Sequence, residues 1–369
     1  MRYCVSKSEG KQVYLQLYEQ LKTDILAGIY PYGRKLPSKR MLAEETGISV
    51  IPVEHAYELL CDEGYVEPRE RSGYFVVYRQ DDFLAAAGKP VLSVAVGHKY
   101  LQHSKKGVFP YTVLAKLMRR VILDYGENIL VKSDNCGCAE LRTAIAAYLA
   151  RSSDIIVSPE QIVIGSGAEY LYGLLVQLLG KQKIFALEDP SYDKIRQVYQ
   201  ANGLQCEMLR LHEDGIDSRQ LANSRAGVLH VTPFNSFPSG SSASASKKYE
   251  YLSWAAKRGG CIIEDNYDSE LTVSRKNEDT LFALAQGKDI PVIYLNTFSR
   301  TIAPSFRAGY MILPSALLAE FQQKVGFYSC TVPVFEQYVL TEILNSGEFE
   351  RHINRLRRER RKQLQNIKK

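Results

Sequence analysis

The chain has 369 residues, of which 45% are hydrophobic, so it can bury a large core and is long enough for more than one domain. It has no apolar run of membrane-spanning length, its polar N-terminus is not that of a signal peptide, and its seven cysteines lack metal-ligand spacing, so we expect a cytoplasmic protein with no membrane partner and no metal site. The formal charge of +6 does not by itself indicate nucleic acid, because residues 351–369 hold nine Lys or Arg against one Glu, and residues 1–78 hold ten against eleven acidic residues.

Residues 11–78 have the pattern of a small DNA-binding unit. Ser38 is suited to cap a helix, and Pro52 suits the first turn of another. Helix, helix-turn-helix and a hairpin wing, in that order, are typical of a winged helix. The first two helices are expected at 14–26 and 39–45, and the strands at 64–67 and 74–77. The third helix is expected to have its cap near Ser49, Pro52 in its first turn and its body at 53–63.

Residues 36–65 and 69–76 resemble the helix-turn-helix and the wing of the GntR family of bacterial regulators. The resemblance implies binding to double-stranded DNA, with the third helix in the major groove. A hydroxyl, cations and free N–H groups at the start of the second helix would hold phosphate. The residues expected to contact DNA are Ser38, Lys39, Arg40, Ser49, Val50, Ile51, Pro52, Arg69 and Arg71.

Three of these positions depart from the family. Val50, Ile51 and Pro52 are apolar where members usually carry polar or basic residues, with a threonine common at the last. Apolar side chains can contact a thymine methyl group but supply no bidentate hydrogen bond to a base. The alternative is a winged helix that has become a packing or dimerisation module.

Residues 79–108 are polar and irregular and are expected to form a linker, followed by an α/β domain at 109–369. In this domain, helical runs alternate with short apolar runs, which indicates β-α units and a mainly parallel sheet covered by helices. The helical runs are 113–124, 139–151, 167–179, 192–202 and 247–258, and the apolar runs are 162–164, 184–187, 228–231, 261–264, 292–296 and 309–313. The basic residues of 351–369 are expected to lie on a solvated helix.

Five segments of this domain resemble motifs of the aminotransferase-like body fused to GntR heads in the MocR/GabR-type regulators. They lie at 164–169, 188–192, 232–240, 262–270 and 297–310. This body has the fold of the fold-type I enzymes that use pyridoxal 5′-phosphate (PLP). The resemblance therefore implies a homodimer and a site for PLP or another small effector.

The resemblance also assigns roles around the cofactor. The turn 166–169 would cradle the phosphate at a helix N-terminus, with Ser299 and Arg307 as further phosphate ligands. Tyr192 would stack on the pyridine ring, Asp265 would pair with its nitrogen, and Tyr267 would bond its hydroxyl group. The expected cofactor residues are Ser166, Gly167, Ala168, Glu169, Tyr192, Asn235, Asp265, Tyr267, Ser299 and Arg307.

Arg300 stands where the resemblance places the lysine that forms the Schiff base with PLP. A guanidinium stays protonated at any working pH and cannot act as that amine. We therefore expect no catalytic residue here and only non-covalent PLP. The chain also ends at Lys369, within an early helix of the family's small C-terminal domain, so that domain is expected to be truncated.

These features support a transcription regulator whose degenerate aminotransferase-like body serves as a dimerisation and sensing module. One alternative is an active PLP enzyme with a DNA-binding head, against which Arg300 argues. Another is a regulator with a purely structural, ligand-free body. The target promoter, the effector and the sign of regulation are not encoded in any of these motifs.

Overall fold

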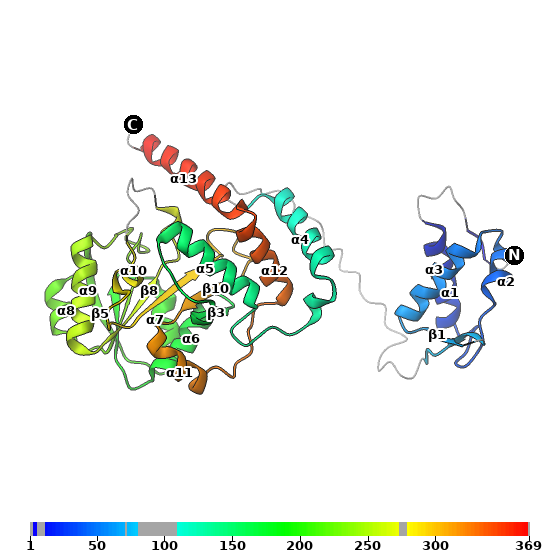
Figure 1. Cartoon of the computed structure of the whole chain (residues 1–369), viewed down its shortest axis with the longest axis horizontal. Helices are drawn as coiled ribbons and strands as arrows, with labels where there is room; N and C mark the ends of the chain where they lie inside the picture. The colour runs from blue at the N-terminus through cyan, green and yellow to red at the C-terminus, as the bar shows by residue number, and fades with distance from the viewer. Residues whose placement is uncertain (1–2, 6–11, 71, 80–108, 273–278, 368–369) are drawn as a thin grey trace. The chain divides into compact units, whose positions relative to one another are not determined.

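The computed structural model describes residues 3–5, 12–70, 72–79, 109–272 and 279–367. The chain divides into two compact units, Met1–Leu101 and Gln102–Lys369, which we call the head and the body (Figure 1). The linker predicted at 79–108 lies outside the described residues apart from Arg79. No helix among the described residues is long and apolar enough to cross a membrane.

The head is a winged helix, which confirms the expected architecture. Its elements are α1 (Val13–Leu26), α2 (Lys39–Thr46), α3 (Val50–Asp62), β1 (Val66–Arg69) and β2 (Gly73–Val76), the two strands being antiparallel. The Ser38 hydroxyl accepts a hydrogen bond from the backbone N–H of Met41 (3.2 Å), and Gly47 ends α2 in the left-handed conformation (φ 69°). α3 begins at Val50, directly after its N-cap residue Ser49, which agrees with the prediction that Ser49 lies near the cap and Pro52 in the first turn.

The core of the head joins its three helices. Leu17 and Leu21 of α1, Leu42 of α2, and Val53 and Leu60 of α3 are fully buried in one hydrophobic cluster. Burying a side chain of this size contributes about 1.5–3 kcal/mol, so the amphipathic spacing seen in the sequence is enough to fix the bundle. The helix-turn-helix formed by α2 and α3 is therefore supported by its packing against α1.

The body is built on one mixed sheet with the strand order β3-β10-β9-β8-β7-β4-β5-β6. The central pairs β4–β5, β4–β7, β7–β8 and β8–β9 are parallel, as expected, whereas β10 is antiparallel to both β3 and β9. The described strands are β3 (Ile162–Gly165), β4 (Phe185–Asp189), β5 (Cys206–His212), β6 (Gly215–Ile216), β7 (Val228–Val231), β8 (Cys261–Asp265), β9 (Val292–Thr297) and β10 (Gly309–Ile312).

Helices cover both faces of this sheet. The α-helices are α4 (Tyr111–Tyr125), α5 (Ala139–Ser153), α6 (Ala168–Leu179), α7 (Asp193–Ala201), α8 (Ser218–Asn223), α9 (Ala245–Arg258), α10 (Leu281–Ala285), α11 (Ser315–Lys324), α12 (Val334–Asn345) and α13 (Glu348–Ile367). Short 3₁₀ helices are η3 (Gly126–Leu130), η4 (Pro159–Gln161) and η5 (Ser269–Leu271). The expected helical and apolar runs therefore match observed elements to within a few residues.

Alternate residues of each strand bury into opposite layers. In β9, Val292 and Tyr294 pack with α5, α12 and α13, whereas Ile293 and Leu295 pack with α6, α7 and α11. Figure 1 shows α12 and α13 on one side of the sheet and α6 and α11 on the other. A sheet buried on both faces explains why its strands read as continuous apolar runs.

Sequence reasoning missed several elements of the body, among them β5. β5 lies between β4 and the two-residue strand β6 and is only partly buried, so residues such as Glu207 and Arg210 interrupt its apolar pattern. The basic tail lies on a helix, α13, with its arginines exposed or half-buried, and two of these arginines also bond the rest of the body. Arg357 donates to the backbone carbonyl of Glu270 (2.6 Å). Arg360 donates to the carboxylate of Asp268 (2.9 Å), which is fully buried and therefore needs a cation.

A buried carboxylate links β4 to the loop after β7. Glu188 accepts hydrogen bonds from the backbone N–H of Thr232 (3.1 Å) and the hydroxyl of Ser236 (2.7 Å). Burial raises its pKa from 4.5 to about 8. Because the folded protein holds this proton more tightly than the unfolded chain, Glu188 makes stability fall as the pH rises between these two values.

We predict that Glu188→Gln flattens this dependence, because a neutral amide mimics the protonated carboxyl group. The variant should gain stability relative to the parent as the pH rises from 5 to 8, at up to about 1.4 kcal/mol per pH unit. Urea unfolding at both pH values measures the difference. A difference that stays constant across this range would show that Glu188 does not titrate there.

Candidate functional site

A cavity of about 310 Å³ opens where the parallel strands of the body end. Ligands of open α/β sheets bind at these carboxyl ends. Seven of the ten residues expected to bind the cofactor line it, which brings together segments far apart in the sequence. The lining residues are Ala168, Glu169, Tyr172, Tyr192, Ile195, Phe237, Asp265, Tyr267, Thr297, Ser299, Arg300 and Arg307.

Asp265, the last residue of β8, places a buried carboxylate on the wall of this cavity. The Tyr172 hydroxyl donates to it, and His230 Nε2 lies 3.6 Å from the same carboxylate oxygen. The other ring nitrogen of His230 bonds the Tyr199 hydroxyl (2.7 Å), while Nε2 is buried without a hydrogen-bond partner. A buried carboxylate backed by such groups fits a cationic ring nitrogen.

The N-terminus of α6 forms a second wall suited to an anion. Gly167, the N-cap residue, has φ 92°, and no side chain in the described part of the chain caps the N–H groups of the first turn. A Cβ atom at Gly167 would lie 3.3 Å from Arg307 Nη2, so glycine permits the close approach of this guanidinium. The donors of this wall suit a phosphate group.

The carboxylate of Glu169 already forms an ion pair with the guanidinium of Arg307 at this wall. This carboxylate lies 3.3 Å from Arg307 and 2.8 Å from Lys194. The hydrogen bond from Lys194 and the charge of Arg307 lower the pKa of Glu169, so it is ionised at neutral pH. An incoming phosphate must therefore compete with this carboxylate for Arg307.

The mouth of the cavity is aromatic. The Tyr192 and Phe237 rings lie edge to face with centroids 6.2 Å apart, and both side chains are exposed. Tyr267 donates its hydroxyl to the Asn235 carbonyl (3.1 Å), and burial raises its pKa to about 12. These rings form apolar walls for a flat, ring-bearing ligand.

Arg300 lines the same cavity and pairs with a carboxylate that sequence reasoning did not single out. Its Nη2 lies 3.4 Å from Asp268, which is fully buried. Asn235 donates its side-chain amide to Asp268 and does not line the cavity, nor do Ser166 and Gly167. Of the missed lining residues, Tyr172 was foreseeable, because it lies one helical turn after Ala168 on the same face of α6.

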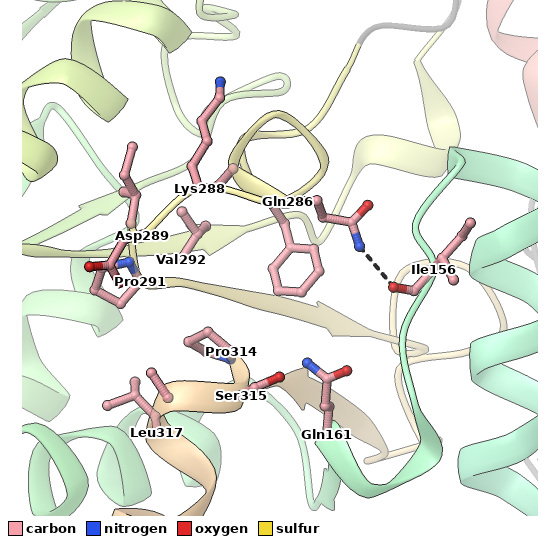
Figure 2. Close-up of a pocket in the computed structure, with 15 residues that line it drawn as sticks. Ile156, Gln161, Gln286, Lys288, Asp289, Pro291, Val292, Pro314, Ser315 and Leu317 are labelled. Carbon is pink, nitrogen blue, oxygen red and sulfur yellow. Dashed lines mark hydrogen bonds between the residues drawn. The ribbon is translucent and has the colours of Figure 1, made fainter.

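A larger cavity of about 460 Å³ lies elsewhere in the body, between the loop after α10 and the start of α11 (Figure 2). Gln286, on its rim, donates its side-chain amide to the Ile156 carbonyl (2.8 Å). None of the residues expected to bind the cofactor lines it. Its lining offers fewer converging charged groups than the smaller cavity, so size alone does not mark the site.

In the head, the expected DNA-contacting residues fall into two groups. Arg40, Ser49, Val50 and Ile51 are exposed around the start of α2 and α3. Ser38 is also exposed and caps α2, and Pro52 is half-buried in the first turn of α3.

Lys39 pairs with Glu54 of α3 (2.5 Å), and Arg69 pairs with Glu67 and stacks on Phe75 with its Cζ 4.5 Å from the ring centroid. Arg71 lies outside the described residues. The exposed cation at the start of α2 is therefore Arg40, and the exposed face at the start of α3 is apolar.

Two family patterns cover most of the chain. The pattern "Bacterial regulatory proteins, gntR family" matches residues 13–76, and "Aminotransferase class I and II" matches residues 98–369.

Three regulatory proteins match almost the whole chain. The uncharacterized HTH-type transcriptional regulator YdeL of Bacillus subtilis is 34% identical over 95% of this chain and 77% of its own length. The pyridoxine biosynthesis transcriptional regulator PdxR of Corynebacterium glutamicum is 30% identical over 95% of this chain and 77% of its own. The probable rhizopine catabolism regulatory protein MocR of Rhizobium meliloti is 28% identical over 94% of this chain and 74% of its own length.

Solved aminotransferases share the fold of the body. An archaeal alanine:glyoxylate aminotransferase superposes with a TM-score of 0.60 and 26% identity, over 66% of this chain and 62% of its own. LysN, an α-aminoadipate aminotransferase from Thermus thermophilus, superposes with a TM-score of 0.62 and 26% identity, over 68% of this chain and 66% of its own. This chain therefore spans less than two thirds of the length of either enzyme.

We predict that Glu169→Gln raises the affinity of the body for PLP about tenfold, because Arg307 loses its competing carboxylate. Glu213→Gln, an exposed carboxylate in the turn between β5 and β6, serves as the control and should leave the affinity unchanged. Equilibrium dialysis with PLP measures both. A weaker affinity in Glu169→Gln would mean that Glu169 supports ligand binding.

Proposed function

Because the chain belongs to the aminotransferase class I and II family and carries a gntR-family head, as its HTH-type regulator relatives do, we propose that it is a cytoplasmic, DNA-binding transcription regulator. The observation that supports this most is the exposed start of α3 above a fully packed helical core. A recognition helix must present its N-terminal residues to base edges while the rest of the head keeps its shape. A packing or dimerisation module would instead bury this start of α3 against another surface, so DNA binding separates the two roles.

The chemistry of this face predicts how it reads DNA. Val50 and Ile51 are exposed and apolar, which favours contact with thymine methyl groups. Arg40, at the start of α2, supplies charge for a backbone phosphate. Most of the affinity would then come from phosphate contacts and be strongly salt-dependent.

We predict that the chain binds a fragment from upstream of its own gene more tightly than random DNA at equal salt. Arg40→Gln should weaken both and reduce the slope of log affinity against log salt by about one. Arg219→Gln, on the exposed side of α8, is the matched control and should change neither. Fluorescence anisotropy measures these values, and equal affinity for both DNAs would favour a packing or dimerisation role for the head.

For the body, we propose a sensing role in which PLP binds without a covalent bond. The groups that support it are Asp265 for the ring nitrogen, Tyr192 and Tyr267 for the ring, and Arg307 with the N-terminus of α6 for the phosphate. In enzymes of this fold, bound PLP acts as an electron sink for reactions of amino acids. In this chain, Arg300 stands where the resemblance places the lysine, so its residues would bind and orient the ligand without attaching it.

The alternatives make different demands on this cavity. An active enzyme needs an amine at the position of Arg300, which a guanidinium does not supply. A purely structural body needs no cavity in which a buried carboxylate, aromatic walls and a guanidinium converge. The purely structural body would be adopted if saturating PLP did not bind in equilibrium dialysis.

We also propose that the body forms a homodimer through α4 and η3. Ile122, Leu123, Leu130 and Val131 are exposed, with Leu123 and Leu130 exposed by 81% and 84%. Exposed large apolar side chains gathered on one segment mark an interaction surface. A sedimentation mass of twice 41.7 kDa would support the dimer, and a mass of 41.7 kDa at micromolar concentration would exclude a stable one.

A further inference from the structure

The turn beside the cavity holds more positive charge than its buried carboxylate needs. Asp268 is fully buried, and Arg360 lies 2.9 Å from its Oδ2, which also accepts the Asn235 amide. Arg300 is the second guanidinium at this carboxylate, at the longer distance of 3.4 Å to Oδ1. One carboxylate charge is thus shared by two permanent cations.

Arg300 is the more accessible of these two cations. Its side chain is 58% exposed, against 32% for Arg360, and it lines the cavity. Among the described residues, its single hydrogen bond is the long one to Asp268, and its Cζ lies 5.9 Å from the Tyr267 ring centroid. Most donors of its planar fork therefore have no protein acceptor.

The cavity thus carries three separate charged features. Arg307 and the N-terminus of α6 suit a phosphate, Asp265 suits a cationic ring nitrogen, and Arg300 remains for a further anion. We propose that the ligand of this cavity is a phosphorylated pyridine that brings its own carboxylate, and that Arg300 binds this carboxylate. The inference rests on the proposed binding of a pyridoxal-type ring in this cavity.

A carboxylate fits Arg300 better than the other groups such a ring can carry. A guanidinium forms bidentate, charge-assisted hydrogen bonds with a carboxylate, repels an ammonium group and gains little from an aldehyde. Because Arg360 already neutralises Asp268, Arg300 can turn to the ligand without leaving a buried charge unpaired. The carboxylate can come from an amino acid linked to the ring or from a ring acid.

The test compares four ligands on the whole chain by isothermal titration calorimetry. They are PLP, pyridoxamine 5′-phosphate, 4-pyridoxic acid 5′-phosphate and N-(5′-phosphopyridoxyl)-L-alanine, of which the last two carry a carboxylate. We expect at least one of these two to bind about tenfold or more tightly than both PLP and pyridoxamine phosphate. Which of them binds tighter distinguishes the ring acid from the amino-acid adduct.

Variants of Arg300 and Arg307 test the separate roles proposed for these two cations. Arg300→Gln and Arg300→Met should bring the affinities for the four ligands to within about twofold of one another, whereas Arg307→Gln should weaken all four. Thermal unfolding identifies any variant that has lost its fold. If one Arg300 variant does not fold, the ligand affinities of the other Arg300 variant test the proposal.

The inference is overturned if PLP binds as tightly as both carboxylated ligands, or if their advantage persists without Arg300. In either case the proposed sensing role remains. If none of the four ligands binds, the sensing role itself fails together with the inference.

Discussion

The body depends on one buried charge, the carboxylate of Asp268. It lies three residues after the end of β8 and is fully buried, so it must be paired within the protein. Its partners come from three other segments: Asn235 after β7, Arg300 after β9, and Arg360 of α13. Removing Asp268 would leave cations facing each other, and removing Arg360 would leave Arg300 as the remaining cation. The position of α13, the cavity wall and the loop around Asn235 are therefore set together.

Much of the fold could be read from local chemistry. The ends of α2 could be predicted because Ser38 and Gly47 are residue types typical of a helix N-cap and of a left-handed helix end. The strands β7, β8 and β9 could be predicted because a sheet buried on both faces makes its strands read as continuous apolar runs. Pairings between distant segments could not be read in this way. The antiparallel direction of β10, the ion pair of Glu169 with Arg307, and the contact of Arg360 with Asp268 depend on tertiary placement, which leaves no periodic signal.

The candidate site shows the same division. Asp265, Tyr192 and Arg307 could be named from motifs, and the structure brings them to one cavity. The electrostatic balance of that cavity could not be named, because it is set by Glu169 on one wall and by Asp268 behind the other. Arg307 pairs with the carboxylate of Glu169, and Arg300 shares the carboxylate of Asp268 with Arg360. These pairings are the basis of the proposed sensing role, in which incoming anions would replace the carboxylates on both walls.

The central claim is that this cavity binds a pyridoxal-type ligand without a covalent bond. The most direct measurement incubates the whole chain with PLP, treats one half with borohydride and leaves the other untreated, and then dialyses both and records intact mass. We predict that PLP is retained in equilibrium dialysis against PLP-containing buffer and that exhaustive dialysis removes it from both halves. A pyridoxyl group that remains on a cavity residue only after borohydride would contradict the claim.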